Sequence, residues 1–205
     1  NSTIKYTLDG SNPLVSDLAN TVNGSASILI DPTNFNNRDK APGFIVSACT
    51  VNSDSLTSDI ITHTYLFPNL INQLSINNQL PGAKWLAPGG SHTISYGMDP
   101  EIYRNPLYSS QMENAFISIP TFSIVTDLDN LFDPDSGIYV NALYHGSEWE
   151  RDASLELIYP NGSEGFQINC GLRIRGGWSR HYDNPKHAFR QLHSRSICPT
   201  SNRNL

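Results

Sequence analysis

The stretch Gly171-Leu-Arg-Ile-Arg-Gly-Gly-Trp-Ser-Arg-His-Tyr-Asp-Asn-Pro-Lys-His-Ala-Phe-Arg190 joins two predicted strands through a pair of glycines. Apolar and polar residues alternate over 166–175, and this period of two predicts a half-buried strand. Arg173 and Arg175 are two residues apart, so we expect them on the same outer face of that strand.

The glycine pair is followed by further cations. Gly176 and Gly177 predict a turn with positive φ, in which backbone N–H groups can approach a ligand. Lys186, His187 and Arg190 are expected on a second strand that begins after the turn. The arrangement is typical of an anion site, and a phosphate would fit between the two strands.

Positive charge is confined to the C-terminal part of an acidic chain. Residues 170–205 hold six Arg and one Lys against one Asp, whereas residues 1–169 hold six basic and eighteen acidic residues. A net charge of −6 would repel nucleic acid over most of the surface, so we predict a small phosphorylated ligand instead. The alternative is that the arginines are solvated or pair with nearby carboxylates, namely Glu148, Glu150, Asp152 and Glu156.

The composition predicts a mainly β protein. Only 16% of the residues are charged, turn-forming residues are frequent, and Val, Ile, Tyr and Phe dominate the short apolar runs. No run of 18 apolar residues is present, so we predict no membrane span. Few lysines and many Asn, Ser and Thr residues are compatible with a secreted or cell-surface protein. The three cysteines, Cys49, Cys170 and Cys198, lack the spacing of a disulfide framework or a zinc site.

The first third of the chain reads as a small β module. Turn residues separate short alternating runs within 1–67, which is the pattern of a β-sandwich. Pro and Gly residues without periodicity predict a connector over 68–90. The expected strands cover 4–8, 27–30, 44–51 and 60–67.

The second part, 91–192, is expected to be a β-rich α+β unit. Short helical turns are predicted from Asp99 until Pro120 ends them. The tail 193–205 is polar and aperiodic, so we expect it to be disordered or aberrant. The expected strands cover 122–126, 137–141, 153–159 and 164–175.

Two carboxylate clusters suggest other chemistry. Asp127, Asp129, Asp133 and Asp135 could attract calcium, but their spacing is not that of an EF-hand, and a helix cap followed by a tight turn explains the same residues. Glu148 and Glu150 would share one face of a strand, as a glycosidase pair requires, or they could pair with arginines.

Two resemblances to known families follow from these residues. Tyr6-Thr-Leu-Asp-Gly-Ser-Asn-Pro13 and Thr64-Tyr-Leu-Phe67 resemble the immunoglobulin-like C-terminal domain of chitobiase and β-hexosaminidase, a packing or spacer module. Residues 119–190 resemble the spore-coat protein H (CotH) family of kinase-like proteins. The resemblance is carried by PTFSIVTDLDNLFDPDSGIYVN, by GSEWERDASLELIYPNGSEGFQINCGLRIRGGWSR and by NPKHAFR.

The CotH resemblance implies the β-rich first lobe of an atypical kinase fold that binds ATP and Mg²⁺. The matching positions, expected to contact the nucleotide, are Arg175, Gly176, Gly177, Ser179, Arg180 and Lys186. The resemblance ends near Arg190, so we expect only the phosphate-binding part of a kinase-like domain, inactive alone, from an exported bacterial protein. In full length it would phosphorylate a protein substrate. The alternative is a non-catalytic module for extracellular assembly or carbohydrate binding.

Overall fold

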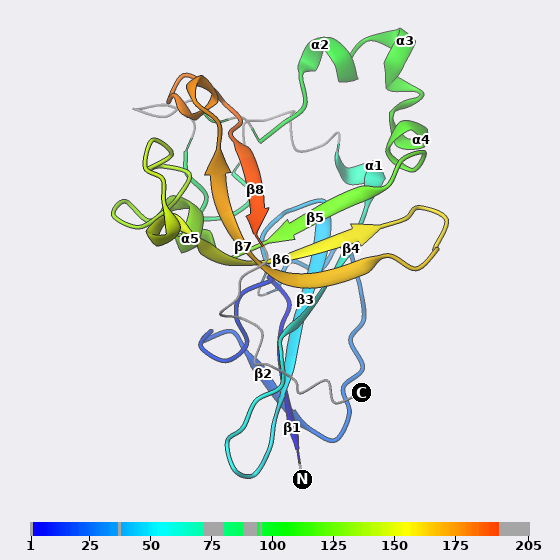
Figure 1. Ribbon diagram of the computed structural model, residues 1–205. Coiled ribbons are helices and arrows are strands. Elements are labelled where there is room, and N and C mark those ends of the chain that lie inside the picture. Colours follow the sequence, from blue (N-terminus) through cyan, green and yellow to red (C-terminus); the bar gives the residue numbers. More distant parts are fainter. Residues whose placement is uncertain (1, 37, 72–79, 88–93, 95, 193–205) are drawn as a thin grey trace, which may run out of the picture.

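The computed structural model describes residues 2–36, 38–71, 80–87, 94 and 96–192 (Figure 1). The described chain is mainly β, as predicted, with two antiparallel four-stranded sheets and a few short helices. The tail 193–205 and part of the expected connector lie outside the described residues.

The first sheet has the strand order β2-β1-β3-β4. Its strands are β1 (Thr3–Thr7), β2 (Asn20–Asn23), β3 (Gly43–Val51) and β4 (Ile61–Leu66). Three of the four expected strands are therefore confirmed. The prediction of a strand at 27–30 is wrong, and the fourth strand of the sheet is β2. The described strands of 1–67 form this one sheet, not the two layers of a self-contained sandwich.

The second sheet has the order β5-β6-β7-β8 and is built from consecutive antiparallel neighbours. Its strands are β5 (Thr121–Val125), β6 (Arg151–Ile158), β7 (Phe166–Arg175) and β8 (Ala188–Leu192). The alternation that predicted β7 places Cys170, Leu172 and Ile174 on the buried face. These side chains form one core cluster with Ala153, Leu155, Ile138 and Ala142.

The helices are short, and α2 (Pro100–Tyr103) begins after Asp99 as predicted, whereas α1 (Pro68–Ile71) lies in the segment expected to be a connector. Asp99 and Asn105 each cap a helix whose first residue is proline, because their side-chain oxygens accept the backbone N–H groups of Glu101 and Leu107. The described α-helices are α1 (Pro68–Ile71), α2 (Pro100–Tyr103), α3 (Pro106–Ser109), α4 (Met112–Phe116) and α5 (Leu128–Phe132). Within the described ranges, no helix has the length and apolar character to cross a membrane.

The segment 137–141, expected to be a strand, is instead a series of turns that covers the core. Its backbone bonds to the end of α5 and not to a strand: Ile138 N donates to the Asn130 carbonyl at 2.8 Å, and Tyr139 N donates to the Leu131 carbonyl at 3.0 Å. Ile138 is nevertheless only 2% exposed. The expected strand is therefore wrong: Ile138 is buried and Tyr139 and Val140 are partly buried, but the backbone hydrogen bonds of this segment are local.

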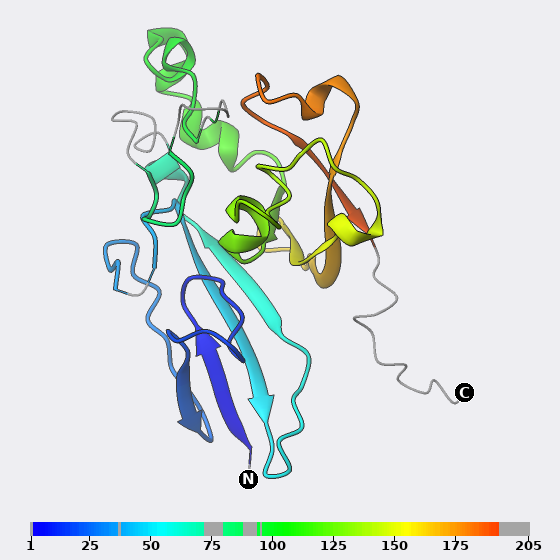
Figure 2. The ribbon, with the colours of Figure 1, turned by 90° about the vertical axis from the view of Figure 1, so that its left-hand side faces the viewer.

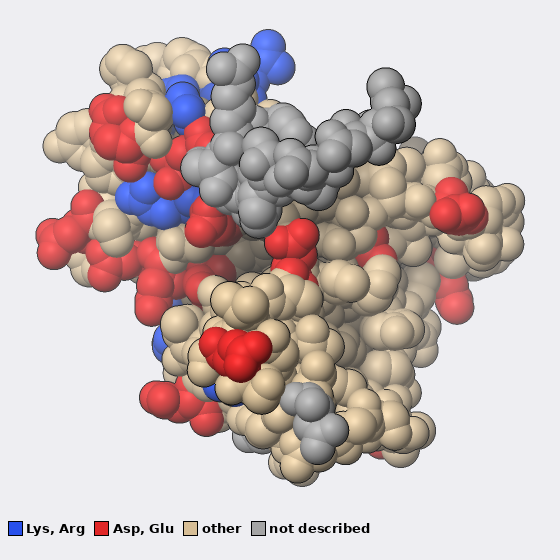
Figure 3. Space-filling model, turned by 60° about the horizontal axis from the view of Figure 1, so that its bottom comes forward, with Lys and Arg blue, Asp and Glu red and all other residues tan. Residues whose placement is uncertain are grey.

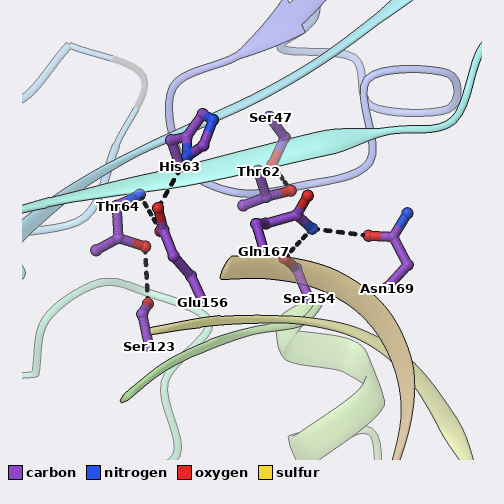
Figure 4. A network of polar contacts seen from close by, with 9 residues as sticks. All are labelled: Ser47, Thr62, His63, Thr64, Ser123, Ser154, Glu156, Gln167 and Asn169. Carbon is purple, nitrogen blue, oxygen red and sulfur yellow. Dashed lines mark hydrogen bonds and ion pairs between the residues drawn. The ribbon is translucent and has the colours of Figure 1, made fainter. Parts of the chain in front are cut away.

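The two sheets meet along β4, which lies nearest to the second sheet (Figures 1 and 2). The contact is polar (Figure 4). Glu156 of β6 accepts hydrogen bonds from two residues of β4. Its Oε1 lies 2.8 Å from His63 Nδ1, and its Oε2 accepts a hydrogen bond from Thr64 N at 2.7 Å. Asn169 Nδ2 donates to the Ile60 carbonyl at 2.9 Å, and the hydroxyl oxygens of Thr64 and Ser123 are 2.7 Å apart. We call this set of contacts the polar seam.

Candidate anion site

The register of β7 and β8 collects three arginines on one face of the second sheet. Arg173 of β7 lies directly opposite Arg190 of β8, and Arg175 follows two residues later on the same face. Like charges directly opposite one another on neighbouring strands are destabilising unless something neutralises them. The pairing therefore needs a counter-charge.

A cavity of about 160 Å³ lies at this end of β7. Its wall includes Tyr144 and Trp149, whose rings are stacked with their centroids 4.7 Å apart. The cavity therefore combines an aromatic wall with cationic side chains. The arginines that line it are Arg173, Arg175, Arg180 and Arg190.

Glu150 neutralises one of these arginines. Arg173 donates to Glu150 Oε2 from Nε at 2.8 Å and from Nη2 at 2.5 Å. The carboxylate lies over Gly171, where an added Cβ would be only 2.1 Å from Glu150 Oε1. Gly171 thus provides the space in which this ion pair forms.

Arg180 stabilises the wall of the cavity through hydrogen bonds to backbone carbonyls. Its guanidinium donates to the carbonyl oxygens of Gly176 at 2.6 Å, Ile174 at 2.7 Å, Tyr144 at 2.8 Å and Ala142 at 3.3 Å. These bonds join the end of β7 to the loop that carries Tyr144. The N–H groups that we expected to contact phosphate are directed at the protein itself.

The guanidinium groups of Arg175 and Arg190 are not neutralised by any carboxylate of the described residues. Within the described part of the chain, neither guanidinium takes part in a hydrogen bond or an ion pair. Both side chains line the cavity, and both residues are exposed. The cavity therefore presents two uncompensated positive charges beside the neutralised Arg173.

The glycine turn behaves as predicted at only one of its two positions. Gly176 has a φ of 114°, a conformation that favours glycine, and an added Cβ would be 1.9 Å from Ser179 Oγ. Gly177 has a φ of −103°, and nothing lies within 4 Å of its added Cβ. The following residues form a single 3₁₀ turn, η2 (Trp178–Arg180).

The remaining predicted positions lie near the turn but outside the cavity wall. Ser179 Oγ donates to the Arg175 carbonyl at 3.4 Å, and its own carbonyl oxygen is 2.9 Å from Nδ1 of the buried His187. Lys186 is exposed and precedes β8. Of the six predicted residues, Arg175 and Arg180 line the cavity, whereas Gly176, Gly177, Ser179 and Lys186 do not.

Sequence reasoning placed Arg190 in the cationic cluster but not among the ligand-binding positions. Arg190 becomes part of the site because it lies opposite Arg173, and that follows from the register between β7 and β8. Sequence reasoning did not identify Tyr144, which lies in a loop without periodicity, and the position of Trp149 beside it depends on the 3₁₀ turn η1 (Ser147–Trp149).

The premise of a glycosidase pair is wrong. Glu148 lies in η1 and β6 begins only at Arg151, so Glu148 and Glu150 do not share the face of a strand. Glu150 is held by Arg173, which was the alternative that the sequence left open.

The aspartate-rich loop after β5 forms the tight turn that its sequence predicts. Asp133 Oδ1 accepts hydrogen bonds from the Ser136 hydroxyl and from the backbone N–H groups of Ser136 and Asp135, and these bonds lower the Asp133 pKa. Asp127 is the N-cap residue of α5, but its side chain accepts Asn12 N at 3.3 Å instead of capping the helix. Across the described ranges, no three His, Cys, Asp or Glu side chains are grouped so as to hold a metal ion.

Charge is unevenly distributed over the surface. On the face shown in Figure 3, acidic side chains are widely scattered, whereas the visible Lys and Arg side chains lie mainly toward one side. A second cavity, of about 830 Å³, lies where the first sheet meets β5 and α5, and its wall includes Asp9, Asp127 and Asp129. An anionic ligand is therefore better matched to the arginine-lined cavity than to this acidic one.

The arginine-lined cavity thus has the chemistry of an anion site, with a positive wall, an aromatic side and a tightly bonded frame. No protein-family model, no curated protein and no solved structure matches this chain.

Proposed function

We propose that this chain binds the phosphates of a nucleotide in the arginine-lined cavity, as the phosphate-binding part of a CotH-type kinase-like domain. The observation that carries the proposal is the pair of uncompensated guanidinium groups of Arg175 and Arg190, which line one cavity from neighbouring strands. Arginine forms bidentate hydrogen bonds with phosphate oxygens, and an anion would relieve the repulsion within the cluster.

In the complete protein, the proposed reaction is transfer of the ATP γ-phosphoryl group to a protein hydroxyl. Such transfer depends on positioning the phosphates and on neutralising their charge, and Mg²⁺ supplies part of that neutralisation when it is bound. The residues of this chain would hold and orient phosphate oxygens, with Arg175 and Arg190 as direct contacts. Arg173 and Arg180 would keep the cavity in shape through their bonds to Glu150 and to backbone carbonyls.

Further parts of the proposal follow from the two resemblances. We infer that the first sheet belongs to an immunoglobulin-like spacer, that the second sheet belongs to the first lobe of the kinase-like fold, and that the protein is exported. Lys186 would approach the phosphates from outside the cavity when ATP and Mg²⁺ are bound. The polar seam supports a spacer role, because it fixes the first sheet against the strands that carry the arginines.

Isothermal titration of the chain with Mg²⁺-ATP and with tripolyphosphate tests the proposal. The double variant Arg175→Ala/Arg190→Ala should lose at least about tenfold in affinity for both ligands, since each charge-assisted hydrogen bond contributes about 1.5–3 kcal/mol. Arg104→Ala removes an arginine on the C-cap of α2, away from the cavity, and should leave both affinities unchanged. Equal affinity of the parent and the double variant would refute the site.

Lys186→Ala separates the family assignment from the cavity itself. A loss of Mg²⁺-ATP affinity in Lys186→Ala would support the kinase-like arrangement. If that affinity is unchanged in Lys186→Ala while the double arginine variant fails to bind, the cavity is an anion site but the CotH-type assignment of Lys186 is wrong.

A further inference from the structure

The turn between β7 and β8 carries a solvent-exposed aromatic stack. Trp178 is 77% exposed and Tyr182 is 51% exposed. One face of the Trp178 ring lies against the imidazole of His181, with a centroid distance of 4.6 Å and only 11° between the planes. The Tyr182 ring lies 4.0 Å from the same imidazole. The other face of the indole is therefore open to solvent.

This stack is held in place by hydrogen bonds. Asn184 Nδ2 donates to the Trp178 carbonyl at 2.9 Å, and Asn184 N donates to the His181 carbonyl at 2.9 Å. His181 N donates to the Trp178 carbonyl at 2.9 Å, and His181 Nδ1 lies 3.2 Å from Asp183 Oδ2. A loop that is fixed in this way but exposes a tryptophan presents a preorganised flat surface, which lowers the entropic cost of binding.

The surroundings of the indole indicate the chemistry of its ligand. Asp183 has a side chain that is 68% exposed, and Lys186 is exposed three residues further on. The centre of a protein interface is depleted of charged residues, so this mixture is poorly matched to an apolar protein partner. A pyranose ring has a flat face of C–H groups that stacks on the electron-rich face of an indole, and hydroxyls at its rim that bond to polar side chains.

We propose that Trp178, supported by His181 and Tyr182, is a stacking platform for the sugar rings of a β-linked polysaccharide. Equatorial linkages leave the C–H face of each ring flat and accessible. Such a face can stack on the exposed face of the Trp178 indole. The platform is separate from the proposed nucleotide site, because Trp178 does not line the arginine-lined cavity. It would attach the chain to an extracellular polysaccharide while the cavity remains free.

Affinity electrophoresis in gels that contain soluble β-linked glucan or glycol chitin tests the platform, with titration of the matching oligosaccharides as a second measurement. Trp178→Ala should weaken binding about tenfold, since loss of one aromatic stacking contact is worth roughly that factor. Trp178→Phe keeps an aromatic ring and should retain most of the affinity. Tyr65→Ala removes a half-exposed aromatic ring on β4 and should have no effect.

Each outcome decides the matter. Retardation by a β-linked polysaccharide that is lost in Trp178→Ala and kept in Trp178→Phe supports the platform. Absence of binding to both the β-linked glucan and glycol chitin, or equal retardation of the parent and Trp178→Ala, overturns it. If Trp178→Ala weakens binding of Mg²⁺-ATP and leaves polysaccharide binding unchanged, the indole belongs to the nucleotide site and the proposal is wrong.

Discussion

Glu156 of β6 and His63 of β4 lie with Oε1 and Nδ1 2.8 Å apart, and this contact joins the two sheets. The second carboxylate oxygen of Glu156 accepts the Thr64 N–H, so one side chain bonds to two consecutive residues of the neighbouring sheet. The Glu156 side chain is only 14% exposed, whereas that of His63 is 55% exposed. Glu156 is therefore the central member of the polar seam.

Glu156→Ala should lower the free energy of unfolding by about 1–3 kcal/mol, because a partly buried backbone N–H would lose its acceptor. Glu156→Gln keeps an oxygen for Thr64 and should lose less. Chemical denaturation followed by circular dichroism measures both. Glu164→Ala, in the exposed hairpin after β6, is the matched control, and a loss of stability as large as that of Glu156→Ala would contradict the role given to the seam.

Arg180→Ala should destabilise the fold by about 2 kcal/mol or more, because four carbonyl oxygens lose donors from one charged group. Arg180→Lys should not restore the loss, since a single ammonium cannot reach carbonyls on both sides of the cavity. Thermal unfolding of both variants checks the expectation. Full stability of Arg180→Lys would show that charge alone matters at this position.

The glycine pair offers a matched comparison within one turn. Gly176→Ala should cost about 1–3 kcal/mol, because Gly176 has positive φ and an alanine methyl group would collide with Ser179 Oγ. Gly177→Ala should cost less, because the space around its added Cβ is empty. Denaturation midpoints of the two variants provide the test, and equal losses would contradict the stated cause.

Asp127 should make stability depend on pH. Burial raises its pKa above the ordinary value of 3.8, with smaller contributions from Asp9 and Asp129, despite the hydrogen bond from Asn12. The folded state therefore binds a proton more readily than the unfolded state. Stability from this group is complete below pH 3.8 and is lost as the pH rises through the higher folded value.

The variant Asp127→Asn removes this titration and keeps an oxygen that can accept the Asn12 N–H. Relative to the parent, it should gain stability at neutral pH, and the gain should vanish below about pH 4. Unfolding curves across this range measure the difference. A gain that stays constant with pH would mean that the Asp127 carboxyl is not the cause.

Local patterns predicted the second sheet well. The alternation over 166–175 predicted β7, and its second half packs on the core through Cys170, Leu172 and Ile174, whereas Phe166 and Ile168 on the same face are exposed. The same reasoning failed at 137–141, where Ile138 is buried although the segment joins no described sheet, since its N–H groups bond to carbonyls near the end of α5. Periodicity reports burial and cannot report the partner of a backbone hydrogen bond.

Predicting the cavity required information that local sequence patterns do not contain. Arg173 and Arg175 were placed on one face from their spacing, but the position of Arg190 required the strand register, and the aromatic wall required the path of the loop that carries Tyr144. Glu150 was one of several upstream carboxylates offered as partners. The space above Gly171, which brings Glu150 to Arg173, is a three-dimensional property.

The polar seam also has a consequence for the arginines. Asn169 bonds to the first sheet and lies on the same strand and face as Arg173 and Arg175. Hydrogen bonds have preferred directions, so they resist sliding of one sheet over the other more than apolar contacts do. The first sheet therefore fixes the position of β7 relative to its neighbours. Substitutions in the first sheet, which does not line the cavity, should therefore change the affinity of the cavity for the proposed anion.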